Sequence, residues 1–139
     1  MMSAIDDIYL AFANLSLGGI KCRNLPEVTL EVAQADLPLR IMVPSTQGEG
    51  TFVMIGTLQK VEWAIHDLCL WAPMAAGNED RYFQPMMDYI KAYLTALKTI
   101  LTPTDQSHLT GWTFQVGPRA WGDGQYWAVD ATFSVEEYL

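Results

Sequence analysis

The sequence has few charged residues, very few basic ones, only two cysteines and no long apolar run. Charged residues make up 17% of its 139 residues, against about 25% in an average soluble domain. Lys and Arg number 8, Asp and Glu number 16, and the formal net charge is −8. Such a chain, with no basic run, repels phosphates, which argues against sequence-reading nucleic-acid binding. No apolar run approaches the length of about 18 residues that a membrane-spanning helix needs.

The two cysteines and the N-terminal residues both favour synthesis in the cytoplasm. Cys22 and Cys69 are too few and too far apart in the sequence for a disulfide framework, so we expect two reduced, buried thiols. Asp6 and Asp7 stand where a signal peptide carries Lys or Arg. We therefore expect the chain to be made and assembled in the cytoplasm, with no membrane contact.

Apolar and aromatic residues are abundant instead. Half of the chain is hydrophobic, and it contains five Trp, six Tyr and five Phe. With so few charges, a monomer exposes apolar patches, and such patches usually mark contacts with partners. The length predicts a single domain, 1–139, with a substantial core.

The spacing of apolar residues predicts two helices. A short one is predicted over 3–16, ended by Gly18 and Gly19, and a long one over about 84–101. Pro85 is expected in the first turn of the long helix. The expected apolar face of this helix is Phe83, Met86, Met87, Ile90, Leu94, Leu97 and Leu101. Its tyrosines, Tyr89 and Tyr93, are interpreted with Met86 and Met87 as core rather than as a ligand pocket.

Alternation of apolar and polar residues predicts the strands. These are a short strand near 28–32, one over 37–44 at a sheet edge because of its flanking prolines, a long stretch over 51–71 bent at Gly56, and a closing antiparallel hairpin, 112–116 with 127–135. Residues 45–50 are expected to be a flexible loop, and 117–124 a glycine-rich turn. Without a βαβ repeat, this order predicts an α+β fold: a mostly antiparallel sheet with a long hairpin, on which both helices pack.

No catalytic signature stands out, and we expect the protein not to be an enzyme. His66 and Asp67 are neighbours on a predicted strand, so they point to opposite faces and cannot form a relay. Asp67 falls on the apolar face, which predicts either an acid satisfied by backbone groups or an interface residue. His66 and His108 are far apart and lack cysteines at ligand spacing, so we expect no metal and no cofactor.

Four residues are candidates for contacts between proteins: Trp71, Arg119, Trp121 and Asp123. Trp and Arg are the types in which binding energy concentrates, and a Trp at a hairpin tip does not easily reach its own core. The alternative is that Trp121 folds back on the sheet. Trp121→Ala is expected to weaken assembly without unfolding the monomer, whereas an unfolded variant would assign Trp121 to the core.

Four segments together give a layout that resembles a known family. They are DLPLRIMVP, KVEWAIHDLCLWAP, the helix YFQPMMDYIKAYLTALKTI, and WAVDATFSVEEYL. Their order resembles that of the tail terminator proteins of long-tailed bacteriophages, and together they cover most of the chain. Two stretches, TLEVAQA and STQGEGTF, depart from the simplest pattern of that family.

The resemblance implies a structural protein of the virion rather than an enzyme. It implies a homo-oligomeric ring, a hexamer, that caps the tail tube protein, stops its polymerisation and offers a docking face to a neck or head-completion protein. DNA would pass through the acidic ring without specific binding. Two alternatives stay open: a neck or head–tail adaptor subunit, and a small dimeric α+β ligand-binding domain or enzyme.

Overall fold

One six-stranded sheet organises the part of the chain that the computed structural model describes: residues 5–23, 37–42, 47–52, 59–74, 79–104, 106–122 and 124–138. The elements follow in the order α1 (Ile5–Ala13), β1 (Lys21–Arg23), β2 (Leu39–Met42), β3 (Gln47–Phe52), β4 (Gln59–Pro73), α2 (Glu79–Leu97), β5 (Ser107–Trp121) and β6 (Gly124–Tyr138). The strand order is β1-β2-β4-β6-β5, with β3 also paired to β4. Only β1 and β2 pair in parallel. The predicted α+β class, with a mostly antiparallel sheet, is therefore confirmed.

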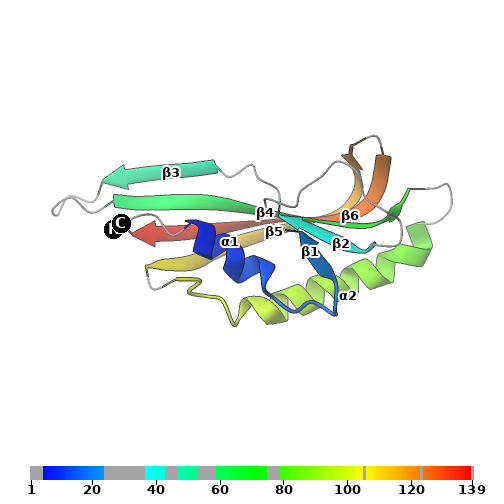
Figure 1. Cartoon of the computed structure of the whole chain (residues 1–139), viewed down its shortest axis with the longest axis horizontal. Coiled ribbons are helices and arrows are strands. Elements are labelled where there is room, and N and C mark those ends of the chain that lie inside the picture. The colour runs from blue at the N-terminus through cyan, green and yellow to red at the C-terminus, as the bar shows by residue number, and fades with distance from the viewer. Residues whose placement is uncertain are drawn as a thin grey trace.

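Both helices cover the same face of the sheet (Figure 1). The alternation predicted for β4 is confirmed, because Ile65, Asp67 and Cys69 all lie buried on the helix side. The main core joins residues of both helices to β2, β4 and β6: Ile8, Phe12, Met42, Ile65, Met86, Tyr93, Leu97, Val129 and Phe133, among others. A smaller cluster on the opposite face consists of Leu39, Ile41, Leu68, Leu70 and Ala128, and we call it the second cluster.

Two expectations about the first half of the sheet are wrong. The strand within 37–44 is not at an edge, because β2 lies between β1 and β4. Residues 47–50 are not a loop, because their backbone pairs with β4 as part of β3, from Gln47 opposite Ala64 to Phe52 opposite Gln59. The pairing with β4 involves residues distant in the sequence, so the lack of apolar residues in 45–50 did not reveal this strand. The predicted strand near 28–32 and the bend at Gly56 lie outside the described residues.

The long helix is rotated relative to the expectation. Its buried residues are Met86, Tyr89, Tyr93 and Leu97, so the two tyrosines are core as predicted. Phe83 and Leu101 were expected on the buried face, but they are 55% and 54% exposed. The helix also begins at Glu79, so Pro85 lies inside it and not in its first turn. Pro85 is exposed on this helix.

The shorter helix and the closing hairpin also differ from their predicted lengths. α1 ends at Ala13, before the turn in which Gly18 and Gly19 adopt positive φ. β5 and β6 are 15 residues each, and Trp121 pairs with Gly124, so most of the expected glycine-rich turn is strand. The tip of this hairpin curls away from the helices (Figure 1). The two cysteines form no disulfide with each other. Cys69 is buried and Cys22 is half-buried.

Candidate interaction surfaces

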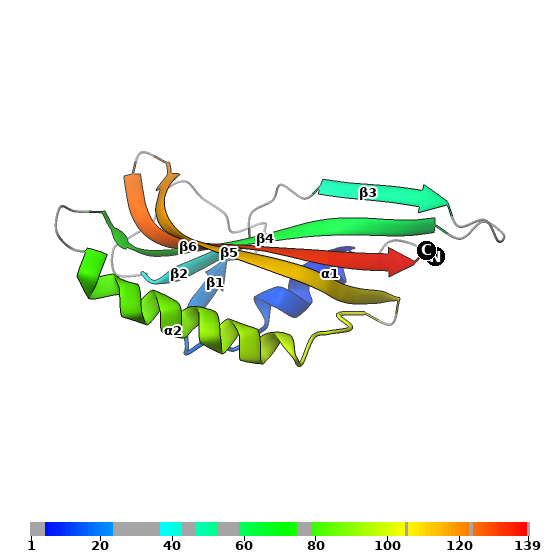
Figure 2. The ribbon, with the colours of Figure 1, turned by 180° about the vertical axis from the view of Figure 1, so that it is seen from behind.

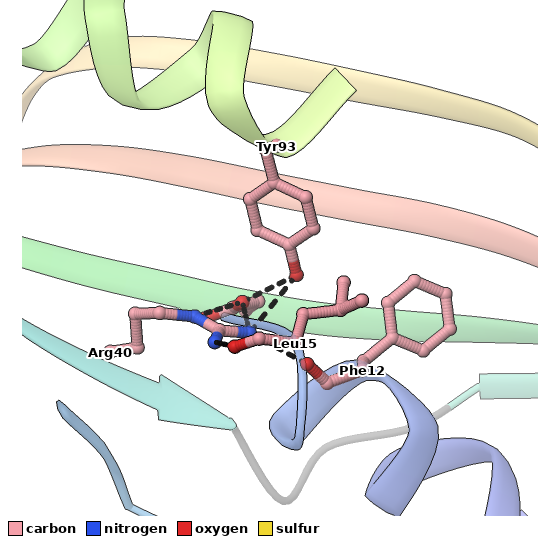
Figure 3. Close-up of polar contacts among 5 residues, drawn as sticks. Phe12, Leu15, Arg40 and Tyr93 are labelled. Atoms are coloured by element: carbon pink, nitrogen blue, oxygen red, sulfur yellow. Dashed lines mark hydrogen bonds and ion pairs between the residues drawn. The ribbon is translucent and has the colours of Figure 1, made fainter. Parts of the chain in front are cut away.

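The most unusual polar contact in the described structure is a salt bridge with no access to solvent. Arg40 of β2 and Asp67 of β4 are both fully buried on the helix side of the sheet. The guanidinium donates from Nε and Nη2 to one carboxylate oxygen, Oδ2, at 3.0 and 2.7 Å. Tyr93 of α2 donates its hydroxyl proton to the same oxygen at 2.6 Å (Figure 3).

The same guanidinium closes the end of α1. Its Nη2 donates to the carbonyl of Phe12 at 2.9 Å and its Nη1 to that of Leu15 at 3.3 Å (Figure 3). The last carbonyls of a helix have no partner within the helix and carry the negative end of its dipole, so a cation placed there satisfies and stabilises them. Arg40 therefore connects α1 to β2 and β4, and Tyr93 connects α2 to the same centre. This cluster holds the two layers together.

Charge and burial shift the pKa values of Arg40 and Tyr93. Burial by itself lowers the pKa of Arg40, but the charge of Asp67 reverses this effect, and the pKa is raised. Burial, followed by the charge of Asp67, raises the pKa of the Tyr93 phenol well above its ordinary value. Tyr93 is thus a neutral donor. Because the cluster is sealed from solvent, its role is structural and it is not a substrate site.

Sequence analysis missed the partner of Asp67. A buried acid was predicted, but the groups that satisfy it are the side chains of Arg40 and Tyr93 and not the backbone. Arg40 stands opposite both Cys22 and Cys69 in the sheet register. The sequence does contain a signal for this pair. Arg40 is the one charged residue in the apolar strand LRIM, and Asp67 is the one charged residue on the apolar face of β4.

A second polar cluster lies on the face of the sheet that carries no helix. His66 of β4 contacts Asp130 of β6 through Nε2, and Arg119 of β5 donates from Nε to the other oxygen of Asp130 at 3.1 Å. The hydrogen bond to Asp130 raises the pKa of His66, and that same bond lowers the pKa of Asp130, with a further contribution from Arg119. The sequence predicted Arg119 as a contact residue at a hairpin tip. In the structure its side chain belongs to a polar cluster that spans β5, β6 and β4.

The His66–Asp130 contact makes stability depend on pH. Because the folded pKa of His66 is raised above 6.5, the contact contributes fully below pH 6.5 and is lost as pH rises through the folded value. On the acid side it is lost below pH 3.8, because the pKa of Asp130 is lowered. We expect His66→Gln to reduce the free energy of unfolding by about 1 kcal/mol at pH 5.5 and by less at pH 9. Urea titrations at both pH values measure this, with His108→Gln as control. An equal loss at both pH values would contradict it.

The other predicted contact residues differ in their surroundings. Trp121 is half-buried and packs with Tyr126 against the second cluster, so it folds back on the sheet as the alternative expected. Trp71 is half-buried against the main core, with its ring 5.7 Å from that of Tyr89. Asp123 lies outside the described residues. The contact role of these residues stays a prediction, and the structure adds that two of them also pack on a core.

A groove between the end of α2 and the start of β5 is the clearest apolar surface. It measures about 410 Å³ and is lined mainly by Leu94, Leu97, Leu101, Leu109 and Trp112, with Lys98 beside them. Trp112 and Leu101 are 52% and 54% exposed. We call this the α2–β5 groove. Its lining has no convergent set of polar groups such as a small-molecule site uses for orientation.

Metal ligands, membrane-spanning helices and known relatives give no further indication of function for the described part of the chain. No group of three or more His, Cys, Asp and Glu that could hold a metal ion occurs among the described residues. Within the same residues, no helix has the length and apolar character to cross a membrane. No protein-family model matches the chain, and no curated protein matches it.

Proposed function

We propose that this protein is a structural subunit of a long-tailed bacteriophage: a tail terminator that caps the tail tube as a ring. In this role it binds copies of itself and the tail tube protein, stops polymerisation of the tube and gives a neck or head-completion protein a face on which to dock. It is assembled in the host cytoplasm and resides in the virion. It performs no catalysis and uses no cofactor.

The observation that carries this proposal is how polar and apolar groups are distributed. The Arg40–Asp67 salt bridge is fully buried. Large apolar side chains are exposed instead, namely Leu10, Met74, Phe83, Leu101 and Trp112. An enzyme needs the reverse arrangement, with polar groups converging in a pocket. Exposed apolar residues around a chain with a net charge of −8 favour a protein that works by association.

Sheet topology and charge support the ring in particular. A closed ring of more than two subunits needs two different, complementary surfaces on each subunit. The described sheet ends in β5 on one side, with β1 and β3 on the other side, so its two borders are unlike. The acidic balance suits a channel through which DNA passes without sticking. The identification of the ring as a tail terminator rests on the resemblance of the four segments named above.

The experiment that tests the proposal adds the purified protein to a polymerising tail tube. The tube protein encoded in the same genome is allowed to assemble with and without this chain, and tube lengths are measured by negative-stain electron microscopy. We expect short tubes capped at one end by a ring, and free protein with a mass near six times 15.6 kDa. Tubes that grow to the same length in both samples would overturn the terminator role.

Other outcomes assign the alternatives. A ring that binds the head connector and leaves tube length unchanged identifies a neck or head–tail adaptor subunit. A dimer that binds a small molecule identifies the ligand-binding or enzyme class. Mass photometry and tube-length measurement together separate these three outcomes.

A further inference from the structure

The layer formed by the two helices has unlike surfaces on its two sides. α1 lies towards β2, because the carbonyls of Phe12 and Leu15 accept hydrogen bonds from Arg40. α2 lies towards β5, because the ring of Tyr93 packs 5.6 Å from that of Phe114. β2 and β5 are on opposite sides of the central β4–β6 pair. The outward face of α1 and the α2–β5 groove therefore mark opposite sides of the molecule.

The α2–β5 groove is built into the fold. The backbone N–H of Leu109 donates to the carbonyl of Leu101 at 2.8 Å, which fixes the return from α2 to β5. A register shift between Leu109 and Gly111 interrupts the pairing of β5 with β6 next to Trp112. A Cβ built on Gly111 would meet no atom within 4 Å, so the space above it is open. The groove is thus an open apolar hollow with a fixed wall. Figure 2 shows the return of the chain from α2 into the start of β5.

The groove includes a cation, Lys98, that forms no ion pair with a described residue. Of the six cations whose side chains the structure describes, Arg40, Lys60 and Arg119 pair with acids. The other three, Arg81, Lys91 and Lys98, are exposed on α2 or directly after it and form no ion pair with a described residue. Lys98 belongs to the groove itself. In a chain of net charge −8, this placement favours an occupant that combines an acid with an apolar side chain.

The outward face of α1 offers that combination. Asp7 and Leu10 are both exposed, Leu10 by 46%, although α1 is otherwise a core helix. They are three residues apart, so they share one face of the helix about one turn from each other. Lys98 and Leu101 both line the groove. A leucine can therefore enter beside Trp112 while the neighbouring carboxylate meets the ammonium group of Lys98.

We propose that the α2–β5 groove binds the outward face of α1 from a second copy of this chain, with Leu10 in the groove and Asp7 paired to Lys98. The donor and acceptor surfaces are different and lie on opposite sides of the molecule, so the contact is head-to-tail and repeats from copy to copy. This inference rests on the proposed function: it specifies the contact between neighbouring subunits, and the closure of these contacts into a ring is taken from the proposal above.

Charge reversal tests the contact on the full chain. Mass photometry and sedimentation give the concentration at which half of the protein is assembled. Asp7→Lys and Lys98→Glu are each expected to raise that concentration about tenfold or more, because each places like charges together. The double variant restores opposite charges at every contact and is expected to assemble like the wild type. Trp112→Ala is expected to raise the concentration about 30-fold.

Matched controls exclude a general effect of charge. Glu62→Lys makes the same change on the face without helices, and Arg81→Glu reverses a free cation at the start of α2, away from the groove. Both are expected to assemble like the wild type. Circular dichroism checks that every variant is folded, which is expected because all of the altered side chains are exposed or lie at the groove.

The outcomes separate this contact from the proposed function. If the double variant fails to recover, or if Trp112→Ala assembles normally, the contact is wrong. In that case the wild-type chain can still shorten tubes, and the terminator proposal stands. If the variants behave as expected but the wild-type ring leaves tube length unchanged, the contact stands and the terminator proposal fails. A wild-type chain that stays monomeric at every concentration overturns the contact.

Discussion

Replacing Asp67 by asparagine is expected to lower the free energy of unfolding by about 3–5 kcal/mol. The substitution keeps the shape of the side chain but removes the charge that Arg40 faces, and both residues are fully buried. An unpaired buried guanidinium is costly because it has lost its hydration without gaining a counter-ion. Three donors converge on Oδ2 of Asp67, so the loss extends to Tyr93 and to the end of α1.

Urea unfolding at one fixed protein concentration measures this loss. Glu62→Gln is the matched control, since it makes the same change from carboxylate to amide on β4 but at an exposed position. We expect the control to stay within about 0.5 kcal/mol of the wild type. The double replacement Arg40→Met with Asp67→Leu removes both charges and is expected to recover most of the stability. A stability of Asp67→Asn within about 1 kcal/mol of the wild type would contradict this structural role of the Arg40–Asp67 salt bridge.

Local pattern was enough to predict the elements near the centre of the fold. The alternation in β4 and β6 and the helical spacing in α2 predict strands and a helix, and these form. Each of these segments buries one face over many residues, so its periodicity is long enough to detect. The class follows because adjacent strands with no helix between them favour antiparallel pairing.

Features that depend on a partner far away in the sequence could not be predicted in this way. β2 looked like an edge strand because of its prolines, but β1 pairs with its other side. Residues 47–50 looked like a loop because they include no apolar residue, but their backbone pairs with β4. The sequence did not reveal the role of Arg40, because its counter-ion, Asp67, is 27 residues away.

The sequence predicted that apolar surface is exposed, but it did not predict where the α2–β5 groove lies. Composition predicted exposed apolar surface, and the structure has it at Leu101, Trp112 and Phe83. The predicted contact residues at the hairpin tip also make contacts within the chain: Arg119 is held by Asp130, and Trp121 packs on the second cluster. The tip curls back over the sheet, and no local signal in GPRAWGDG shows this curvature. The α2–β5 groove was missed because Leu94 and Leu101 were assigned to a buried face.

A pair of phenylalanine substitutions tests the rotation of α2, and the two are expected to differ strongly. Phe133 of β6 is fully buried, with ring centroids 4.8 Å from Phe12, 5.0 Å from Tyr93 and 5.8 Å from Phe114. Phe133→Ala opens a cavity among these rings and is expected to cost about 3–5 kcal/mol of unfolding free energy. Phe83→Ala removes the same side chain from an exposed position on α2, and we expect a change within about 0.5 kcal/mol.

Thermal and urea unfolding of both variants decide which face of α2 is buried. The sequence favoured a buried stripe that ran from Phe83 through Met86 to Leu101. The structure buries Met86 of that stripe together with Tyr93 and leaves Phe83 exposed. Only the second arrangement puts Tyr93 against Phe133 and leaves Phe83 in solvent. If Phe83→Ala destabilises the protein as much as Phe133→Ala does, α2 is rotated away from the observed packing. The groove beside Leu94 and Leu97 would then lose its wall, and the contact proposed there would fail with it.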